Sequence, residues 1–230
     1  MTSPFYVPPE QMMKDRADFA RKGIARGRAL VALVFADGIA LVAENPSNNL
    51  RKISEIYDRI AFAGVGRYNE FDQLRVAGVR MADLKGYQYS RDDVDARGLA
   101  NRYGESLGQI FTHDMKPMEV EILIAEVGVE PTRDQIFHIL YDGTVIDERN
   151  YCVLGGEAER ISGALATSYQ PALDLAGALG VAVGALAGPD RQIPVGELEV
   201  AVLDRSGARR CFRRLSGAQV EALVPARSQG

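Results

Sequence analysis

The feature that most restricts the fold is the apolar hairpin formed by residues 29–43. Residues 29–36 carry no polar side chain. Asp37 and Gly38 supply a two-residue turn typical of a β-hairpin, and residues 39–43 continue as a second apolar strand. A strand that is apolar on both faces must be covered on both faces. The hairpin therefore predicts a layered domain with this sheet in its interior.

The segment before the hairpin predicts a helix. Pro9 suits the first turn of a helix. An apolar stripe at helical spacing follows it and consists of Met13, Ala17, Ala20 and Ile24. Because this helix precedes the first core strand, it has little in its own domain to pack on. We expect it to contact a neighbouring chain.

Strand and helix patterns alternate in groups along the rest of the chain. The strand patterns occupy residues 53–65, 118–124, 136–154 and 198–215. The helix patterns occupy residues 69–116, 157–188 and a short stretch from Ser216. Antiparallel hairpins grouped apart from helix pairs indicate two stacked sheets with helices outside. We therefore predict an α+β fold, a four-layer αββα sandwich of two antiparallel sheets flanked by helices, with an extra N-terminal helix.

Composition narrows the function classes. The 230-residue chain has 47% hydrophobic and 25% charged residues, as ordinary globular proteins do. Its net charge of -4 and pI near 5.4 argue against a nucleic-acid binder, which normally carries a basic surface. The longest uncharged stretch, residues 175–188, is shorter than the ~20 residues that cross a bilayer. Together with the lack of a signal-peptide pattern, these properties predict a cytoplasmic protein that binds neither nucleic acid nor a membrane.

The residues suited to metal chemistry show no recognisable spacing. The two histidines, His113 and His138, have no ligand-like neighbour at metal spacing. Neither a metal nor a cofactor is therefore predicted. Cys152 and Cys211 occupy apolar, strand-like contexts, and two cysteines in a chain of this length are expected to be free thiols in a reducing compartment.

No hydrolase triad is indicated either. The chain has two histidines and no Gly-x-Ser-x-Gly sequence, the motif that positions the nucleophile of many serine hydrolases. Glu119 and Glu121 fall on the same face of a predicted strand. That arrangement is more typical of a solvated edge than of an acid–base pair.

Four segments follow one another along the chain: "PPEQMMKDRADFARKGIAR", "FADGIALVAENPS", "LRKISEIYDRIAFAGVG" and "YNEFDQLR". Together, in this order, they resemble a proteasome α subunit, most closely of the actinobacterial kind. The resemblance runs over nearly the whole chain. It implies the fold of N-terminal-nucleophile hydrolases, with residues 1–9 as a mobile N-terminal gating tail and residues 10–230 as a single α-type domain.

The same resemblance implies that the chain is not catalytic. In the related β subunits an N-terminal Thr is the nucleophile, assisted by an Asp and a Lys; the corresponding positions here are predicted to be Arg28, Glu44 and Glu55. A Thr nucleophile also uses its own α-amine as the base, so the chain must be cleaved before it. The only Gly-Thr pair, Gly143-Thr144, lies within a predicted hairpin, where cleavage would divide the core.

The resemblance implies a gated outer ring of the bacterial core particle. Seven copies would form the ring, pair with β subunits and admit tagged, unfolded protein substrates. A regulatory ring ATPase or other activator would dock by its C-terminal tails, and the positions that match the family's docking pocket are Lys52 and Gly66. The gate would comprise Phe5, Tyr6, Val7 and Pro8.

Two alternatives remain open at this point. The chain could be an active N-terminal-nucleophile threonine hydrolase that matures at an unexpected site. It could also be a binding module that uses the sandwich for a small ligand. A threonine hydrolase of this class must lose its N-terminus, and a ligand-binding module need not form a ring.

Overall fold

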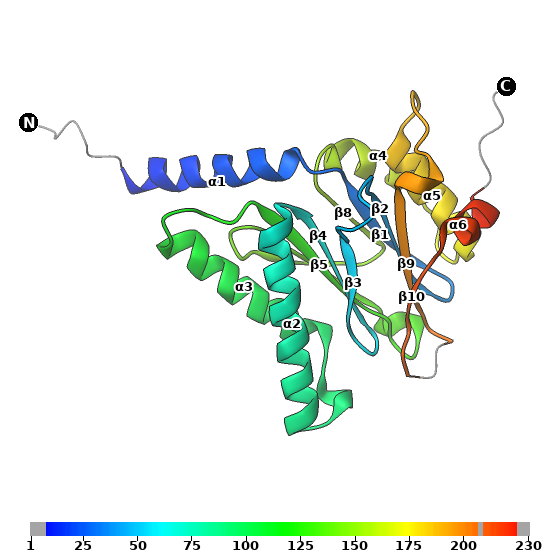
Figure 1. Cartoon of the computed structure of the whole chain (residues 1–230), viewed down its shortest axis with the longest axis horizontal. Helices are drawn as coiled ribbons and strands as arrows, with labels where there is room; N and C mark the ends of the chain where they lie inside the picture. The colour runs from blue at the N-terminus through cyan, green and yellow to red at the C-terminus, as the bar shows by residue number, and fades with distance from the viewer. Residues whose placement is uncertain (1–7, 207–208, 225–230) are drawn as a thin grey trace, which may run out of the picture.

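The computed structural model describes residues 8–206 and 209–224, which form two β-sheets between layers of helices (Figure 1). The α-helices are α1 (Pro9–Ala25), α2 (Tyr68–Gln88), α3 (Ala96–His113), α4 (Ala158–Ser168), α5 (Leu175–Ala187) and α6 (Gly217–Leu223). The strands are β1 (Leu30–Phe35), β2 (Gly38–Glu44), β3 (Ile53–Tyr57), β4 (Ile60–Gly66), β5 (Val120–Glu126), β6 (Gln135–Ile139), β7 (Val145–Glu148), β8 (Tyr151–Leu154), β9 (Leu198–Asp204) and β10 (Phe212–Arg214). Short 3-10 helices are η1 (Arg91–Asp93), η2 (Pro131–Arg133) and η3 (Val195–Glu197).

The strands form two five-stranded antiparallel sheets. One sheet has the order β10-β9-β2-β1-β8, and the other has the order β3-β4-β5-β6-β7. Helices α2 and α3 pack on the outer face of the second sheet, and α4 and α5 pack on that of the first (Figure 1). The predicted αββα sandwich is therefore confirmed.

Three apolar layers hold the sandwich together. The layer between the sheets contains alternate residues of β1 and β2, such as Leu30 and Leu41, which are fully buried. The opposite faces of the same strands pack against α5, with Val31 and Val42 equally buried. A third layer joins α2 and α3 to the second sheet. The central hairpin is thus covered on both faces, as its apolar sequence requires.

Helix α1 packs partly on its own domain. Its stripe residues Ala20 and Ile24 are buried with Tyr141, and α1 contacts β4 and β5. The Arg16 guanidinium adds a 2.7 Å bond from Nε to the Phe111 carbonyl. The expectation that this helix lacks a partner within its own domain is wrong for its C-terminal half, because the ends of β4 and β5 supply one. The N-terminal half stays exposed, so contact with a neighbouring chain remains a prediction.

Strand β5 is central in its sheet, because β4 and β6 pair with it on either side. The expectation that Glu119 and Glu121 mark a solvated edge is therefore wrong. Glu119 precedes β5 and pairs with Lys116 at 2.9 Å and with Arg67 at 3.6 Å. The side chain of Glu121 is 18% exposed and lies 3.6 Å from His138. These carboxylates bind local partners and do not face each other as an acid–base pair.

Among the helices within residues 8–206 and 209–224, none has an apolar stretch long enough to span a lipid bilayer.

Candidate functional site

The candidate site lies at the end of the sandwich where β1 begins and β2 ends. Arg28 comes two residues before β1, and Glu44 is the last residue of β2. Leu30 pairs with Ala43 across the hairpin, and the Glu44 amide donates to the Ala29 carbonyl at 3.2 Å. The register of the apolar hairpin thus places two charged side chains next to each other.

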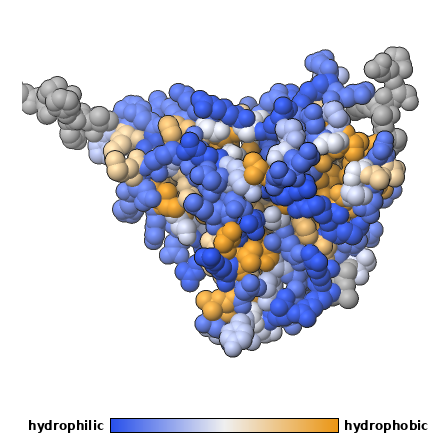
Figure 2. Space-filling view, viewed as in Figure 1, coloured by the Kyte–Doolittle hydropathy of each residue, from blue (hydrophilic) through white to orange (hydrophobic). Residues whose placement is uncertain are grey.

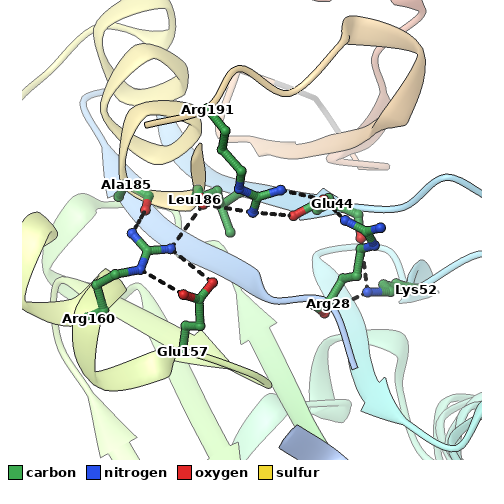
Figure 3. Close-up of polar contacts among 8 residues, drawn as sticks. All are labelled: Arg28, Glu44, Lys52, Glu157, Arg160, Ala185, Leu186 and Arg191. Carbon is green, nitrogen blue, oxygen red and sulfur yellow. Dashed lines mark hydrogen bonds and ion pairs between the residues drawn. The ribbon is translucent and has the colours of Figure 1, made fainter. Parts of the chain in front are cut away.

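The carboxylate of Glu44 is buried between two arginines (Figure 3). Its side chain is 3% exposed, Arg28 Nη1 donates to Oε1, and Arg191 donates to both oxygens at 2.8 and 2.7 Å. The bonds from Arg191 hold the pKa of the Glu44 carboxyl below its usual range, although burial acts in the opposite direction. The carboxylate is therefore charged at neutral pH and fixes both guanidinium groups.

A second group of contacts ties this site to the helices behind the sheet (Figure 3). Arg191 donates to the carbonyl of Leu186 at 3.2 Å, and Arg160 donates to the same carbonyl at 3.2 Å and to that of Ala185 at 3.1 Å. Arg160 also pairs with Glu157 at 3.2 Å. The two arginines thus satisfy carbonyls at the end of α5, which an α-helix leaves without partners. Sequence reasoning missed Arg191 because it lies in a loop and no local pattern links it to Glu44.

Lys52 reaches the same site from the residue before β3. Its Nζ donates to the carbonyls of Arg28 at 2.7 Å and Glu44 at 3.0 Å. Burial lowers the pKa of Lys52 to about 8, against the opposing effect of the nearby carboxylates of Glu199 and Glu44. The ammonium is held by backbone oxygens at the mouth of the charged network, and it still carries a charge for most of the time at pH 7.

The start of β3 is positioned by Glu199 from the other sheet. This carboxylate is 2% exposed and accepts hydrogen bonds from the amides of Lys52 at 2.9 Å and Ile53 at 3.2 Å. It also accepts a 2.7 Å bond from Asn45 Nδ2 and pairs with Arg214. A buried charge is tolerated only when it is paired and hydrogen-bonded, as this one is. Glu199 therefore fixes the point from which the Lys52 side chain extends.

Gly66 lies on the other side of the connection between α1 and β1. Its φ of +108° is in the region that favours glycine, and a Cβ here would collide with the Glu119 carbonyl. A Cβ on Gly27 would lie 3.2 Å from the Gly66 amide nitrogen, so the two backbones are in contact. Lys52 Nζ binds the next carbonyl, that of Arg28. The structure thus brings both predicted docking residues, Lys52 and Gly66, to the segment of residues 27–28.

Comparison with known proteins assigns the family. The family model "Proteasome subunit" matches residues 24–201. The chain is 58% identical to the proteasome subunit alpha of Acidimicrobium ferrooxidans, over 100% of this chain and 99% of the relative. It is 56% identical to the proteasome subunit alpha of Sanguibacter keddieii, over 100% of this chain and 93% of the relative. It is 53% identical to the proteasome subunit alpha of Saccharopolyspora erythraea, over 100% of this chain and 91% of the relative. The chain belongs to the proteasome α subunit family.

An α subunit is the non-catalytic, outer-ring subunit of the core particle, which contains β subunits as well. The chemistry of the site agrees with this assignment. The resemblance predicts Arg28 at the nucleophile position, and its guanidinium stays protonated and offers no nucleophilic lone pair. Its backbone nitrogen is bonded to Gly27 and cannot serve as a free α-amine. The alternative of an active threonine hydrolase is therefore set aside.

One residue of the predicted correspondence is wrong. The resemblance predicts Glu55 beside Arg28 and Glu44, at the position of the assisting lysine of β subunits. In the α subunit, Glu55 instead pairs with Arg210 at 2.6 Å, and Lys52 is the residue that contacts both carbonyls. The register of β3 decides this, because Glu55 is opposite Ala61 inside the strand while Lys52 precedes it. The α subunit thus keeps a lysine and a carboxylate at the site but has no nucleophile there.

Of the predicted gate residues, Phe5, Tyr6 and Val7 lie outside the described residues. Pro8 is exposed and directly precedes α1. Its carbonyl accepts a 3.0 Å bond from the Met12 amide, which is the first hydrogen bond of the helix. Pro8 is therefore part of the start of α1, and any test of the gate has to leave it in place.

Proposed function

We propose that seven copies of this α subunit form a gated ring whose outer face binds the C-terminal tails of a ring ATPase or other activator. Residues 1–9 are the gate, and residues 10–230 are the single domain that forms the ring and pairs with β subunits. The activator opens the gate and feeds tagged, unfolded proteins into the particle. Within the described residues, the two buried cysteines do not form a disulfide, which supports a reducing cytoplasmic setting.

The observation that carries the proposal is the state of Lys52. An ammonium has three N–H donors, and the carbonyls of Arg28 and Glu44 use two of them. The third is left for an anion from outside the chain. A terminal carboxylate suits this position because it is always charged at neutral pH and occurs once per tail. Both carbonyls also fix the ammonium in advance, which reduces the entropy lost on binding.

Gly66 supports the same proposal from the opposite side of residues 27–28. Without a side chain, Gly66 packs against the Glu119 carbonyl and touches the Gly27 backbone, and this contact holds the segment whose next carbonyl, that of Arg28, binds Lys52. Arg28 is half exposed and adds positive charge next to Lys52. A cavity of about 410 Å³ adjoins this segment; its lining includes Gly27, Arg28, Glu44 and Arg191, whereas Lys52 and Gly66 lie outside the lining. A negatively charged chain end therefore meets a positive, partly enclosed position.

The test is Lys52→Ala in a core particle that is assembled with β subunits. We expect the variant to lose activator-stimulated degradation, because removing a partly buried partner of a charge costs about 2–5 kcal/mol per site. The loss compounds when several tails bind one ring. Peptide hydrolysis by a gate-deleted particle should be unchanged, since Lys52 does not take part in the chemistry.

Lys85→Ala is the matched control, because Lys85 is half exposed and pairs with Asp95 on the α2–α3 side of the molecule. It should leave activator binding unaltered. If the Lys52→Ala particle binds the activator with an affinity within about threefold of the unmodified particle, the docking role of Lys52 is wrong.

A further inference from the structure

Four residues with metal-binding side chains face the space between the two sheets at one open side of the sandwich. They are Glu121 on β5, His138 on β6, Glu148 on β7 and Cys152 on β8. Their positions follow from strand alternation, because residues two apart on a strand face the same side. Leu123, Ile136 and Leu154 lie two residues from Glu121, His138 and Cys152, and all three belong to the apolar layer between the sheets.

The tertiary fold brings three of these residues together although they are distant in the sequence. One ligand atom each of His138, Glu148 and Cys152 lies within 4.8 Å of the other two. His138 is directly opposite Ile146 in the β6–β7 pair, so Glu148 follows two residues further along the same face. Cys152 belongs to the other sheet. The cluster therefore joins β7, an edge strand of one sheet, to β8, an edge strand of the other.

The environment of His138 indicates that a partner is missing. Its Nε2 atom is buried and has no hydrogen-bond partner, and its side chain is only 12% exposed. An unsatisfied buried polar atom costs about 1–3 kcal/mol, so proteins normally avoid one. The nearest carboxylate oxygen, Oε2 of Glu121, is 3.6 Å away, too far for a hydrogen bond. A metal ion bound by the ring would remove this cost.

We propose that His138, Glu148 and Cys152 bind a zinc ion that clamps the open edges of the two sheets. Imidazole, carboxylate and thiolate are the ligand types that zinc prefers, and three of them leave one tetrahedral position for water. Donors bound at 2.0–2.3 Å from zinc are about 3.5 Å apart, so closing the site needs side-chain shifts of about 1 Å. Glu148 can supply much of this shift, because it is only half-buried.

Binding of the ion forms one bond each to nitrogen, oxygen and sulfur and releases the thiol proton of Cys152 to solvent. The carboxylate of Glu121 beside the imidazole adds negative charge that favours a cation. Glu148 ends β7 and Cys152 is the second residue of β8, so the ion also closes the two-residue turn between these strands. The ion has a structural role and is separate from the Lys52 docking site.

The experiment measures zinc binding by the full chain after treatment with a chelator. We expect one zinc ion per chain and a higher melting temperature with zinc, because the ion binds only the folded state. Cys152→Ser and His138→Gln should each weaken binding by more than about tenfold, the scale seen even for outer partners of zinc ligands. Cys211→Ser and His113→Gln are matched controls at the other cysteine and the other histidine, and they should bind zinc normally.

A cobalt titration of the unmodified chain keeps the test valid if a variant fails to fold. Cobalt(II) bound by Cys152 should give an intense thiolate-to-metal absorption band. The Cys211→Ser variant should show the same band, and adding zinc should abolish it by displacing the cobalt. Equal zinc affinity in the unmodified chain, Cys152→Ser and His138→Gln would overturn the proposal. A cobalt spectrum without the thiolate band would overturn it as well.

Discussion

Lys52 combines burial with a positive charge, and at the residue scale this combination predicts that the proposed tail docking depends on pH. Burial is the main cause of its lowered pKa of about 8. The charged fraction of such a group falls about tenfold between pH 7 and pH 9. A neutral amine cannot pair with a carboxylate. We expect the affinity of a labelled activator tail peptide for the particle to fall by about the same factor over this range, as measured by fluorescence anisotropy.

The variant Lys52→Arg tests this pH dependence, because it keeps the positive charge but does not lose its proton between pH 7 and pH 9. Arginine stays protonated throughout this range, so binding by the variant should be almost independent of pH. Its planar fork suits a different approach of the carboxylate, and binding at pH 7 should recover only in part. A pH dependence of the same size in Lys52→Arg would show that another group, and not Lys52, titrates.

At the scale of the elements, the entrance of β3 depends on one buried carboxylate from β9. Glu199 accepts the amides of Lys52 and Ile53 and pairs with Arg214. Glu199→Ala leaves the buried amide of Ile53, the partly buried amide of Lys52 and the partly buried guanidinium of Arg214 without their acceptor. We expect the free energy of unfolding to fall by about 2–4 kcal/mol in urea denaturation of the chain.

The control for this change is Glu197→Ala in the neighbouring 3-10 helix η3 (Val195–Glu197). Its carboxylate makes no hydrogen bond to β3, and the expected effect is within about 0.5 kcal/mol. A Glu199→Ala chain as stable as the Glu197→Ala chain would mean that β3 is held by sheet pairing alone. Tail binding by Glu199→Ala should also weaken, because Lys52 loses its fixed starting point.

At the scale of the whole molecule, α1 extends across one end of the sandwich and points away from it at its N-terminus (Figure 1). Hydrophilic residues cover much of the face in this view, with apolar patches between them (Figure 2). Met12 and Phe19 on α1 are 47% and 46% exposed. In the proposed ring, these exposed apolar side chains of α1 would be available to a neighbouring subunit, and that contact stays a prediction.

Deletion of residues 2–7 tests the gate in the assembled particle. Residues 1–9 contain three prolines, at positions 4, 8 and 9. Pro8 is kept, because its carbonyl begins α1. We expect peptide hydrolysis to become several-fold faster while particle size in gel filtration stays the same. An intact particle with an unaltered rate would show that these residues do not limit entry.

Much of the fold could be predicted because its signals are local. The Asp37-Gly38 turn between two apolar runs specified a covered hairpin, and strand and helix periods located the remaining layers. Predictions failed where they depended on contacts between elements. The sequence alone gives helix α1 no partner in its own domain and assigns Glu119 and Glu121 to an edge, because strand order within a sheet cannot be read from a single strand.

The sequence by itself determined the layers, the family resemblance and the lack of a nucleophile at Arg28, since each depends on residue type and short-range order. Only the tertiary structure decided which charged groups meet. Glu44 and Arg191 are 147 residues apart, and Lys52 replaces Glu55 at the site through the register of β3. The physical reason is that hydrophobic periodicity fixes which face of an element is buried, whereas side-chain partners are set by the pairing of strands from distant parts of the chain.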